Sequence, residues 1–402
     1  RAAGGGVLPP DTPLAPYDLL VDALLGTGLS SEVRSPFREA VEALAAAPAP
    51  VVAVDMPSGL SADSGQVLGA AAPAELTVTF VGRKRGLFTG DGPDFAGVVH
   101  FDDLGIPEGV RQDHPGSGRL LQTSDAGRAP RPANSHKGLF GRVVVLGGAE
   151  GMAGAVAMAG WASLRSGAGW VVCCAAPGAL GAVGGFPPEL LTADWDRAEA
   201  LAGQADALAL GPGLGRSEAA AGLVAAGLRT DRPLVLDADG LNLVAERPEL
   251  AEALRGRAAA SVLTPHPGEA ARLLGITGGA VQGDRFGAAR RIAETYGAVC
   301  CLKGAGTVIA GPEVGYAVCP TGNPGMSMAG QGDILTGILA AELARGEAPE
   351  PAAGRAVWAH GAAGDRVAAA QGPFGFTATE CADALPAVWR RLTSAGDRGP
   401  RT

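Results

Sequence analysis

Most of this 402-residue chain consists of short, continuous apolar runs that alternate with segments of helical spacing. Four such runs in the first hundred residues are DLLVDALL, PVVAVDM, LTVTFVG and GVVHFDD. Between the first two, SPFREAVEALAAA has the spacing of a helix that begins with a serine cap and a proline in its first turn. Because the apolar strands are continuous, we predict an α/β fold with a parallel sheet covered on both faces.

This pattern is interrupted between residues 108 and 132, where the chain loses periodicity and gains Pro, Gly and charge. It restarts at Ala133 with RVVVLGG, WVVCCAAP, ADALALGPG, PLVLDADG, SVLTPHPG and AVCCLKG. We predict two α/β domains, residues 1–107 and 133–402, joined by a linker over 108–132. Most strands of the second domain run into Gly, Pro, Asp or His, at the strand ends where open α/β sheets bind ligands.

Composition narrows the class of protein. Hydrophobic residues make up 47% and charged residues 18%, which predicts sizeable cores, and a net charge of −9 argues against sequence-independent nucleic-acid binding. Without a long apolar run or a signal peptide, we expect a cytoplasmic protein that does not contact membranes. The six cysteines lack CxxC spacing and are expected to be buried, reduced thiols. Because the chain begins with Arg1 rather than Met, we expect an N-terminal piece to be missing.

One stretch, TGNPGMSMAGQGDILTG at residues 321–337, places Asp333 in the first turn of a helix that starts near Gly332. Successive glycines let backbone N–H groups approach an anion, and the helix adds the positive end of its dipole. Asp333 could simply cap the helix, or it could accept a hydroxyl proton during phosphoryl transfer. The stretch alone leaves both interpretations open.

Lysine is rare, since only three of the 32 Lys and Arg residues are lysines. Lys303, in the Gly-rich turn LKGAGTV, follows a buried strand and is a candidate phosphate ligand or a solvated strand end. His266 stands between two prolines before a helix near Gly268, which favours a ligand contact or a structural turn. In VLDADGLNLV, Asp237 could cap a helix or bind a ligand or Mg²⁺.

Two carboxylates of the first domain also stand at strand ends. Asp55 is followed by Ser58 in VDMPSGLSADSG, and Asp22 precedes a glycine turn in VDALLGTGLSSE. A carboxylate with a nearby hydroxyl suits proton transfer or a monovalent cation, although Asp and Ser also form ordinary turns.

Neither a Walker loop nor a G-x-G-x-x-G fingerprint is present. Five motifs in order, HKGLFGRVVVLGG, GPGLG, TPHPGE, KGAGT and NPGM…AGQGD, resemble instead the ribokinase-like NAD(P)H-hydrate dehydratases over residues 133–389. The segment before them resembles the NAD(P)H-hydrate epimerase domain, so the whole chain is similar to the fused bacterial repair enzymes. The resemblance implies a ribokinase-like C-terminal domain and a partial Rossmann-like α/β N-terminal domain.

That resemblance also implies a reaction, in which the S epimer of hydrated NADH or NADPH is dehydrated at the expense of ADP, or of ATP in eukaryotic relatives. Asp333 would take the hydroxyl proton, and the ring nitrogen would expel the transferred phosphate. The hydrate would contact Ala155, Gly213, His266 and Asp333. Mg²⁺ is expected with the nucleotide, which would bind Lys303, Gly304, Ala305, Gly306, Thr307, Asn323, Pro324, Gly325, Met326, Ser327, Met328, Ala329, Gly330, Gln331 and Gly332.

For the epimerase domain, the resemblance implies Asp22 and Ser58 as potassium ligands and Asp55 as the group that transfers protons. Substrate contacts would come from Asp55, Gly26, Thr27, Gly28, Leu29, Ser30, Ser31 and Glu32. Relatives begin with an NNGGDG loop that nothing here matches, and Ser61 stands where relatives often have Asp. We therefore expect this chain as given not to epimerise.

Two other functions remain open from the sequence. A ribokinase-like kinase of a vitamin or sugar alcohol would share Asp333 and the anion-binding glycines but release a phosphorylated product. A non-catalytic nucleotide sensor or scaffold would bind ADP without turnover. Resemblance further implies a homo-oligomer.

Overall fold

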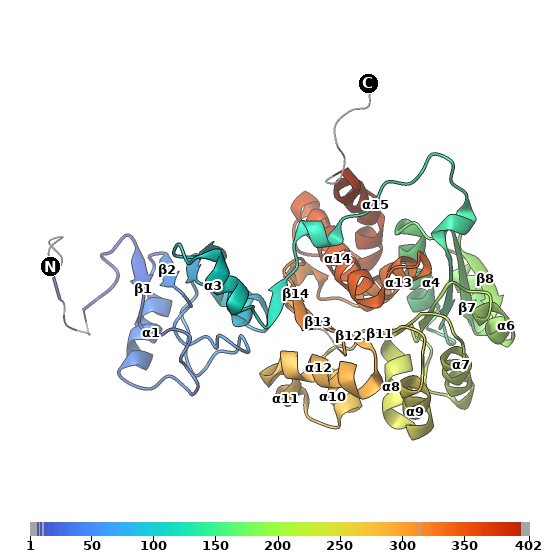
Figure 1. Ribbon diagram of the computed structural model, residues 1–402, viewed down its shortest axis with the longest axis horizontal. Helices are drawn as coiled ribbons and strands as arrows, with labels where there is room; N and C mark the ends of the chain where they lie inside the picture. The colour runs from blue at the N-terminus through green and yellow to red at the C-terminus, as the bar shows by residue number, and fades with distance from the viewer. Residues whose placement is uncertain (1–5, 8, 10–11, 313–314, 395–402) are drawn as a thin grey trace. The chain divides into compact units, whose positions relative to one another are not determined.

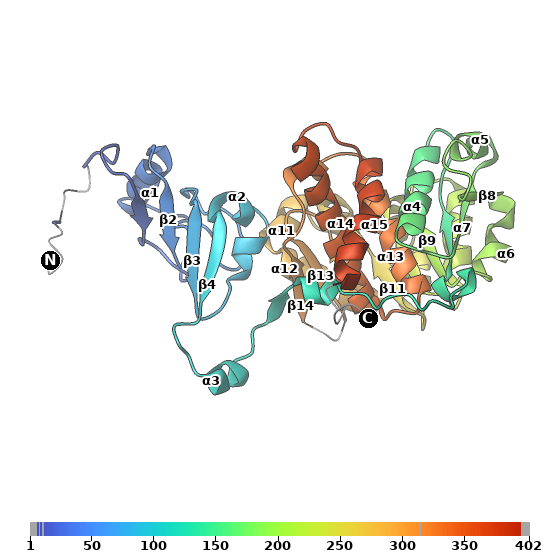
Figure 2. The ribbon, with the colours of Figure 1, turned by 90° about the horizontal axis from the view of Figure 1, so that it is seen from above.

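The computed structural model describes residues 6–7, 9, 12–312 and 315–394 and divides the chain into two compact units, residues 1–117 and 118–402. In the first unit, all described strands are parallel and follow the order β1-β2-β3-β4, which Figure 2 shows with its flanking helices. This confirms the predicted parallel sheet. The elements are β1 (Leu20–Asp22), α1 (Phe37–Ala46), β2 (Val51–Val54), β3 (Leu76–Phe80), η1 (Arg85–Phe88), α2 (Gly92–Ala96), β4 (Val98–Asp102) and α3 (Glu108–Asp113).

Two details of this unit differ from the sequence-based expectation. Its edge strands are not covered on both faces, since Val21 is 60% and Val98 70% exposed. Ser35 does not cap α1 either: its hydroxyl donates to the Glu39 carboxylate (2.6 Å), and Pro36 occupies the N-cap position. The continuous apolar runs predicted the positions of the strands correctly. The prediction that both faces of the sheet are covered was wrong at the edge strands, because apolar residues there can face solvent.

The second unit is built on a ten-stranded sheet in the order β5-β14-β13-β12-β11-β10-β9-β6-β7-β8. The seven strands from β12 to β8 are parallel, and β13 is antiparallel to both of its neighbours. The strands are β5 (Gly118–Leu120), β6 (Arg142–Leu146), β7 (Trp170–Ala175), β8 (Leu191–Asp194), β9 (Ala207–Leu210), β10 (Leu234–Leu236), β11 (Ser261–Leu263), β12 (Val299–Leu302), β13 (Thr307–Ala310) and β14 (Tyr316–Cys319).

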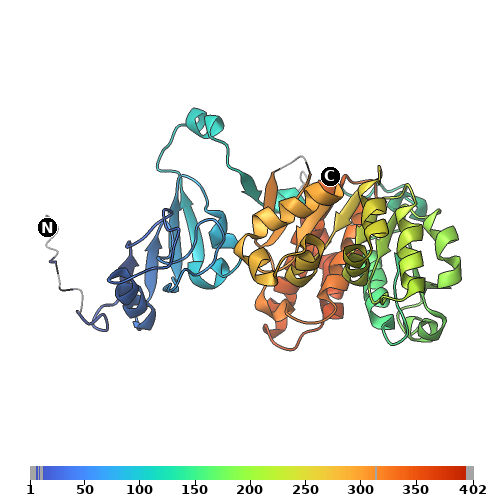
Figure 3. The ribbon, with the colours of Figure 1, turned by 90° about the horizontal axis from the view of Figure 1, so that it is seen from below.

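Helices cover both faces of this sheet, as Figures 1 and 3 show from different sides. One layer consists of α4 (Ala153–Arg165), α13 (Gln331–Ala344), α14 (Pro349–Gln371) and α15 (Ala378–Ser394). The other includes α7 (Glu218–Leu228), α8 (Ala238–Glu246), α9 (Pro248–Arg255), α10 (Pro267–Leu274), α11 (Gly278–Gly283) and α12 (Arg285–Tyr296). Shorter elements are η2 (Thr123–Ala126), η3 (Lys137–Phe140), η4 (Pro177–Ala179), α5 (Leu180–Val183), η5 (Trp195–Arg197), α6 (Ala198–Ala202) and η6 (Pro324–Met326).

The segment expected to be an irregular linker is partly ordered into the second unit. Its residues 118–120 form β5, which pairs in parallel with β14, and Leu121 is fully buried in the core. The structural boundary therefore lies between Ser117 and Gly118, inside the predicted linker. Loss of periodicity concealed β5 because a three-residue edge strand is too short to show a period.

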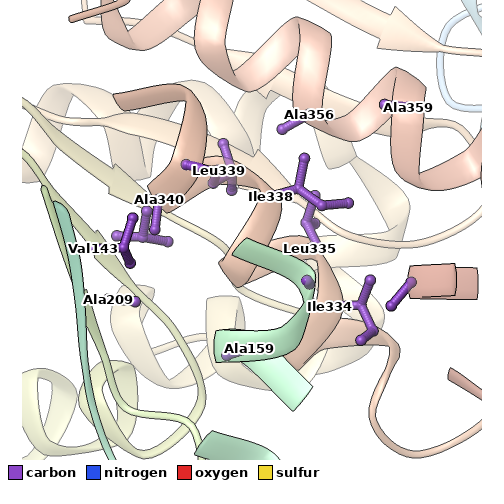
Figure 4. Packing of buried hydrophobic residues seen from close by; sticks show 14 of the residues in the cluster. Val143, Ala159, Ala209, Ile334, Leu335, Ile338, Leu339, Ala340, Ala356 and Ala359 are labelled. Carbon is purple, nitrogen blue, oxygen red and sulfur yellow. The ribbon is translucent and has the colours of Figure 1, made fainter. Parts of the chain in front are cut away.

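Helix α13 lies at the centre of the larger core, between the sheet, α4 and α14 (Figure 4). Its residues from Ile334 to Ala344 are all buried, as expected for a helix that is largely apolar, and the two polar ones, Thr336 and Glu342, have buried partners. Close approach to α4 depends on Gly337, where an added Cβ would lie 2.0 Å from the Ala159 carbonyl oxygen. All six cysteines are buried and free, which confirms the prediction of reduced thiols. No described helix meets the length and apolarity needed to cross a bilayer.

Replacing Gly337 by Ala is expected to lower the free energy of unfolding by about 1–3 kcal/mol, because the methyl group has no room between α13 and α4. The matched control is Gly222→Ala in α7, where an added Cβ meets nothing within 4 Å. That change is expected to raise stability by up to about 1 kcal/mol through helix propensity. Urea denaturation of both variants measures the contrast, and equal effects would contradict the tight α4–α13 contact.

Candidate active site

A buried ion pair joins the ends of two parallel strands of the larger sheet. Asp237 follows β10 and Lys303 follows β12, and Lys303 Nζ lies 2.7 Å from Asp237 Oδ1. Thr264 donates a hydrogen bond to the same oxygen (2.7 Å), and Thr336 donates to Oδ2 (2.9 Å). Asp237 is 1% exposed, so every bond to its carboxylate is shielded from water. Strands β10, β11 and β12 and helix α13 thus meet at one buried carboxylate.

Both members of this pair are held in their charged forms. Burial opposes ionisation of Asp237, but the Lys303 charge and the hydrogen bonds from Lys303, Thr264 and Thr336 outweigh it and lower the pKa of Asp237. Burial likewise works against the Lys303 ammonium, yet Asp237 and then Glu269 raise the pKa of Lys303. Removing one partner would leave the other as an uncompensated buried charge, which typically costs about 3–5 kcal/mol.

Asp333 lies beside this ion pair in the first turn of α13, as the sequence predicts. A Cβ built on its neighbour Gly332 would be 3.2 Å from Lys303 Nζ and 3.6 Å from Asp237 Oδ2. Burial, and then the negative charge of Asp237, raise the pKa of Asp333 to about 7, against the opposing effect of Lys303. The N-cap residue of α13 is Gly330, and no side chain forms a capping hydrogen bond at this end of the helix. Asp333 therefore does not act as the cap, and its carboxyl group titrates near neutral pH.

The glycine-rich loop before α13 is anchored to α14. Asn323 Nδ2 donates to Asp365 Oδ1 (2.9 Å), and the Gly322 amide donates to Asp365 Oδ2 (3.0 Å). At the other end of the loop, Gly330 has φ +93°, and a Cβ there would lie 2.9 Å from Met158. These constraints leave the loop little freedom and fix where its backbone amides lie ahead of α13.

The turn from Lys303 to Thr307 rests on a buried arginine that the sequence did not single out. Arg285, 1% exposed at the start of α12, donates to the carbonyl oxygens of Leu302 (3.2 Å) and Lys303 (3.3 Å). Gly304 has φ +138°, and a Cβ there would lie 3.0 Å from the Arg285 guanidinium. Arg285 thereby positions the backbone of Lys303. No pattern distinguishes this arginine from the many surface arginines of the chain.

His266 is the N-cap of α10 and forms a capping box with Glu269. Its Nδ1 accepts a hydrogen bond from the Gly268 amide (3.0 Å), while Glu269 Oε2 accepts from the His266 amide (2.8 Å). The structural role is confirmed, and the ligand contact stays a prediction, since the imidazole is half-exposed. Burial, and then Lys303, lower the pKa of His266, which favours its neutral form.

Glu269 is a titratable group of the site that sequence reasoning missed. Its Oε2 lies 3.9 Å from Lys303 Nζ, and burial raises its pKa to about 7, partly offset by Lys303. The signal was present, because a Glu at the third helical position after a capping residue is a capping-box pattern. His360 on α14 was also missed: its Nε2 lies 2.8 Å from Gln331 Oε1, and burial lowers its pKa to about 4.

The predicted hydrate contacts gather at the same edge of the sheet. Gly213 has φ +58°, and a Cβ there would lie 3.0 Å from the Ala155 Cβ, so these two residues are neighbours. The GPGLG loop also packs on the residues after β10, since a Cβ on Gly211 would lie 1.9 Å from the Asp237 carbonyl oxygen. The structure thus brings Ala155 and Gly213 to the strand ends that carry Asp237.

In the first unit, the predicted Asp22–Ser58 pair is formed. Ser58 donates to Asp22 through its hydroxyl (2.5 Å) and its amide (2.7 Å), and both residues are fully buried. The Ser58 hydroxyl also accepts a hydrogen bond from the Leu25 amide (2.9 Å). Within the described part of the chain, no Lys, Arg or His pairs with Asp22. A buried carboxylate without a cation is costly, so this position fits a monovalent cation.

Asp55 is the other predicted residue of this unit and adopts φ +71°, an uncommon conformation for a residue with a side chain. Its carboxylate forms an ion pair with Lys84 and accepts a hydrogen bond from the Phe80 amide (3.2 Å). A Cβ on Gly26 would lie 4.0 Å from Asp55 Oδ2, so the segment 26–32 begins beside this carboxylate. At its far end, Glu32 lies next to Gly69 instead.

The described residues contain no group of three His, Cys, Asp or Glu side chains arranged to hold a metal ion. Asp237, one of the candidates for Mg²⁺, has its oxygens engaged by Lys303, Thr264 and Thr336. The helix-capping alternative for Asp237 also fails, because its side chain makes no cap bond.

Comparison with known proteins identifies the class. The second unit resembles a ribokinase-like superfamily protein from Enterococcus faecalis, with a TM-score of 0.61 and 26% identity over 69% of this chain and 96% of that one. It also resembles the ADP/ATP-dependent NAD(P)H-hydrate dehydratase from Bacillus subtilis, with a TM-score of 0.62 and 33% identity over 68% and 98%. The unit thus has a ribokinase-like fold, as predicted.

Family models and relatives cover both units. Residues 143–387 match the NAD(P)H-hydrate dehydratase model and residues 3–86 the YjeF-related N-terminal model. The chain is 43% identical to the bifunctional NAD(P)H-hydrate repair enzyme from Coxiella burnetii, over 93% of this chain and 76% of the relative. It is 39% identical to the bifunctional NAD(P)H-hydrate repair enzyme from Escherichia coli, over 92% of this chain and 71% of that relative. The chain belongs to the bifunctional NAD(P)H-hydrate repair enzyme family.

The raised pKa of Asp333 predicts a specific pH dependence of stability. A carboxyl whose pKa is about 7 when folded and about 4 when unfolded favours the folded state while protonated, so this stability is lost as pH rises from about 4 to 7. Asp333→Asn removes that dependence. Between pH 5 and 8 the variant should gain about 2–3 kcal/mol relative to the wild type, measured by urea denaturation. A difference between the two proteins that does not change with pH would contradict the raised pKa.

Proposed function

We propose that the second unit dehydrates the S epimer of NAD(P)H hydrate at the expense of ADP, and that Asp333 is its base. The observation that carries this proposal is the position of Asp333, a carboxyl with a pKa of about 7 beside the Lys303–Asp237 ion pair. A base with a pKa near the working pH combines a useful ionised fraction with proton affinity. Membership of the repair-enzyme family supplies the substrate class.

Phosphoryl transfer followed by elimination accounts for the reaction. Asp333 would remove the proton of the ring hydroxyl, whose oxygen would then bond to the terminal phosphorus of ADP as AMP departs. The ring nitrogen would next push its electron pair into the ring and expel the phosphate, and loss of a proton from the neighbouring ring carbon would restore the carbon–carbon double bond of the dihydronicotinamide. The balance is hydrate and ADP to NAD(P)H, AMP and phosphate. The His266 imidazole, kept neutral, would lie near the ring without competing for the proton.

Two backbone segments would hold the nucleotide, 303–307 and 323–332. The free backbone amides at the start of α13 lie at the positive end of the helix dipole, which suits a negatively charged phosphate. Lys303 would place its ammonium next to the transferred group, already ionised by its contact with Asp237. Because the described residues form no metal cluster of their own, Mg²⁺ would arrive on the nucleotide phosphates, where it neutralises charge.

For the first unit, we propose that Asp55 is the proton-transfer group of an epimerase site and that Asp22 and Ser58 bind its potassium, with epimerisation itself depending on the NNGGDG loop that this sequence does not match. Support comes from the match of residues 3–86 and from the strained backbone of Asp55 beside Lys84. The cation would offset the buried Asp22 charge. Stabilisation against heat by KCl over choline chloride, lost in Asp22→Asn, tests the potassium site without any activity measurement.

The dehydration proposal predicts that ADP restores the dihydronicotinamide absorbance of hydrated NADH in the presence of the protein. Asp333→Asn is expected to lower the turnover number by about 10²–10⁴-fold, the usual contribution of a general base. The matched control is Asp231→Asn, at a carboxylate that is 93% exposed. It should behave as the wild type.

Failure of ADP and ATP to restore absorbance, with a phosphorylated alcohol released from another substrate, would identify a kinase instead. Nucleotide binding by calorimetry without any turnover would identify a sensor. Wild-type turnover in Asp333→Asn would remove this residue from the mechanism.

A further inference from the structure

A cavity lies in the larger unit at the C-terminal ends of α4 and α13, away from the candidate active site. It has a volume of about 360 Å³ and is lined by the last residue of α4, the residue after α13 and the final turns of α15. Asp333 and Arg345 stand at opposite ends of α13, whose 14 residues span about 20 Å. The cavity is therefore separate from the proposed nucleotide site.

Its lining is strongly cationic. Five arginines border it: Arg128, Arg131, Arg165, Arg345 and Arg390. Three carboxylates offset part of this charge. Glu342 contacts Arg128, and Asp383 lies 3.4 Å from Arg165. Burial lowers the pKa of Arg345, and the charge of Glu347 opposes that lowering. Glu342 is shared with Arg355, which lies 2.8 Å away and does not line the cavity. Positive charge thus remains in excess around the cavity.

Part of this cluster has a structural explanation. Helix C-termini attract cations, and Arg128 donates to the Ser166 carbonyl (2.8 Å) just past α4, while Arg131 donates to that of Gly167. Arg345 also follows a helix C-terminus, that of α13, but in the described residues it donates to no helix carbonyl oxygen. Its guanidinium makes no hydrogen bond or ion pair with any residue that the structure describes, and its Nε is buried. The fully buried Ser166 hydroxyl also lacks a partner within the described residues.

The closeness of these arginines to one another disfavours their charged forms. Burial, followed by the charges of Arg345, Arg355 and Arg131, holds the pKa of Arg128 well below its usual range. Burial and Arg345 also lower the pKa of Arg131. Guanidinium groups that are partly desolvated and repel one another are stabilised when an anion lies between them.

We propose that this cavity binds a diphosphate or triphosphate group, either inorganic or carried by a nucleotide. Guanidinium forks match phosphate oxygens in paired hydrogen bonds, and several arginines around one cavity suit a ligand with more than one charge. The cavity is within the range that holds small ligands, about 300–1,000 Å³. Arg345 would supply free donors, and the Ser166 hydroxyl would supply another. This site does not depend on the proposed dehydration.

Calorimetric titration with inorganic pyrophosphate tests the proposal in the full chain. Arg345→Gln is expected to weaken binding at this cavity by at least about 10-fold, since a charge-assisted phosphate contact is worth about 1.5–3 kcal/mol. Arg131→Gln provides a second variant in case the first unfolds, as its thermal transition would reveal. The matched control is Arg291→Gln, at an exposed arginine of α12 outside the cavity, which should bind as the wild type.

Lys303→Met separates this cavity from the proposed active site. Pyrophosphate binding that survives in Lys303→Met and is weakened in Arg345→Gln supports the proposal. Binding that is lost in Lys303→Met and unchanged in folded Arg345→Gln and Arg131→Gln overturns it, as does an absence of binding in the wild type. Repeating the titration with ADP shows whether the diphosphate is inorganic or carried by a nucleotide. If the cavity binds nucleotides, Lys303→Met still binds ADP, and the double variant Lys303→Met, Arg345→Gln binds it more weakly. If ADP binding is the same in both, the cavity takes inorganic diphosphate. ADP-dependent dehydration by Arg345→Gln should equal that of the wild type.

Discussion

The buried contact between Asp237 and Lys303 fixes the arrangement of everything else in the candidate active site. Asp237 receives hydrogen bonds from β11 and α13 as well as from Lys303, so one carboxylate joins four elements of the fold. Its charge raises the pKa of Asp333 and that of Lys303. Without Lys303, the same charge would be buried and unpaired, and the geometry around it would not persist.

Helix α13 is the second constraint. It begins at the ion pair and is buried from Ile334 to Ala344, so the partly buried turn that carries Asp333 cannot shift far without disturbing the core. Gly337 permits the close contact with α4, and the loop before the helix is tied to Asp365 on α14. The proposed base is therefore held by packing on one side and by electrostatics on the other. Such rigid placement is what proton transfer and phosphate binding require.

Much of this could be predicted from sequence where a local signal existed. The start of α13, the strand ends and the prominence of Lys303 followed from glycine patterns, apolar runs and the scarcity of lysine. The partnership of Lys303 with Asp237 could not, because 66 residues separate them and either residue alone fits several roles. Nothing in the sequence around Arg285 indicates its role. The capping-box pattern of Glu269 could have been recognised from the sequence but was not.

Two predictions were wrong because they depended on spatial neighbours that the local sequence pattern does not show. The supposed linker contains β5, whose strand character depends on pairing with β14 nearly 200 residues away. The apolar edge strands of the first unit are exposed at Val21 and Val98, although their composition resembles that of buried strands. In both cases the neighbour in space, not the local sequence, determined the outcome.

The central claim is that the hydroxyl oxygen of the hydrate attacks the nucleotide after Asp333 takes its proton. Isotope tracing tests it directly: hydrated NADH labelled with ¹⁸O in the ring hydroxyl is turned over with unlabelled ADP, and the released phosphate is analysed by mass spectrometry. Our account predicts that the label appears in inorganic phosphate, because the ring carbon–oxygen bond breaks after phosphorylation. Label recovered in water, with unlabelled phosphate, would contradict it.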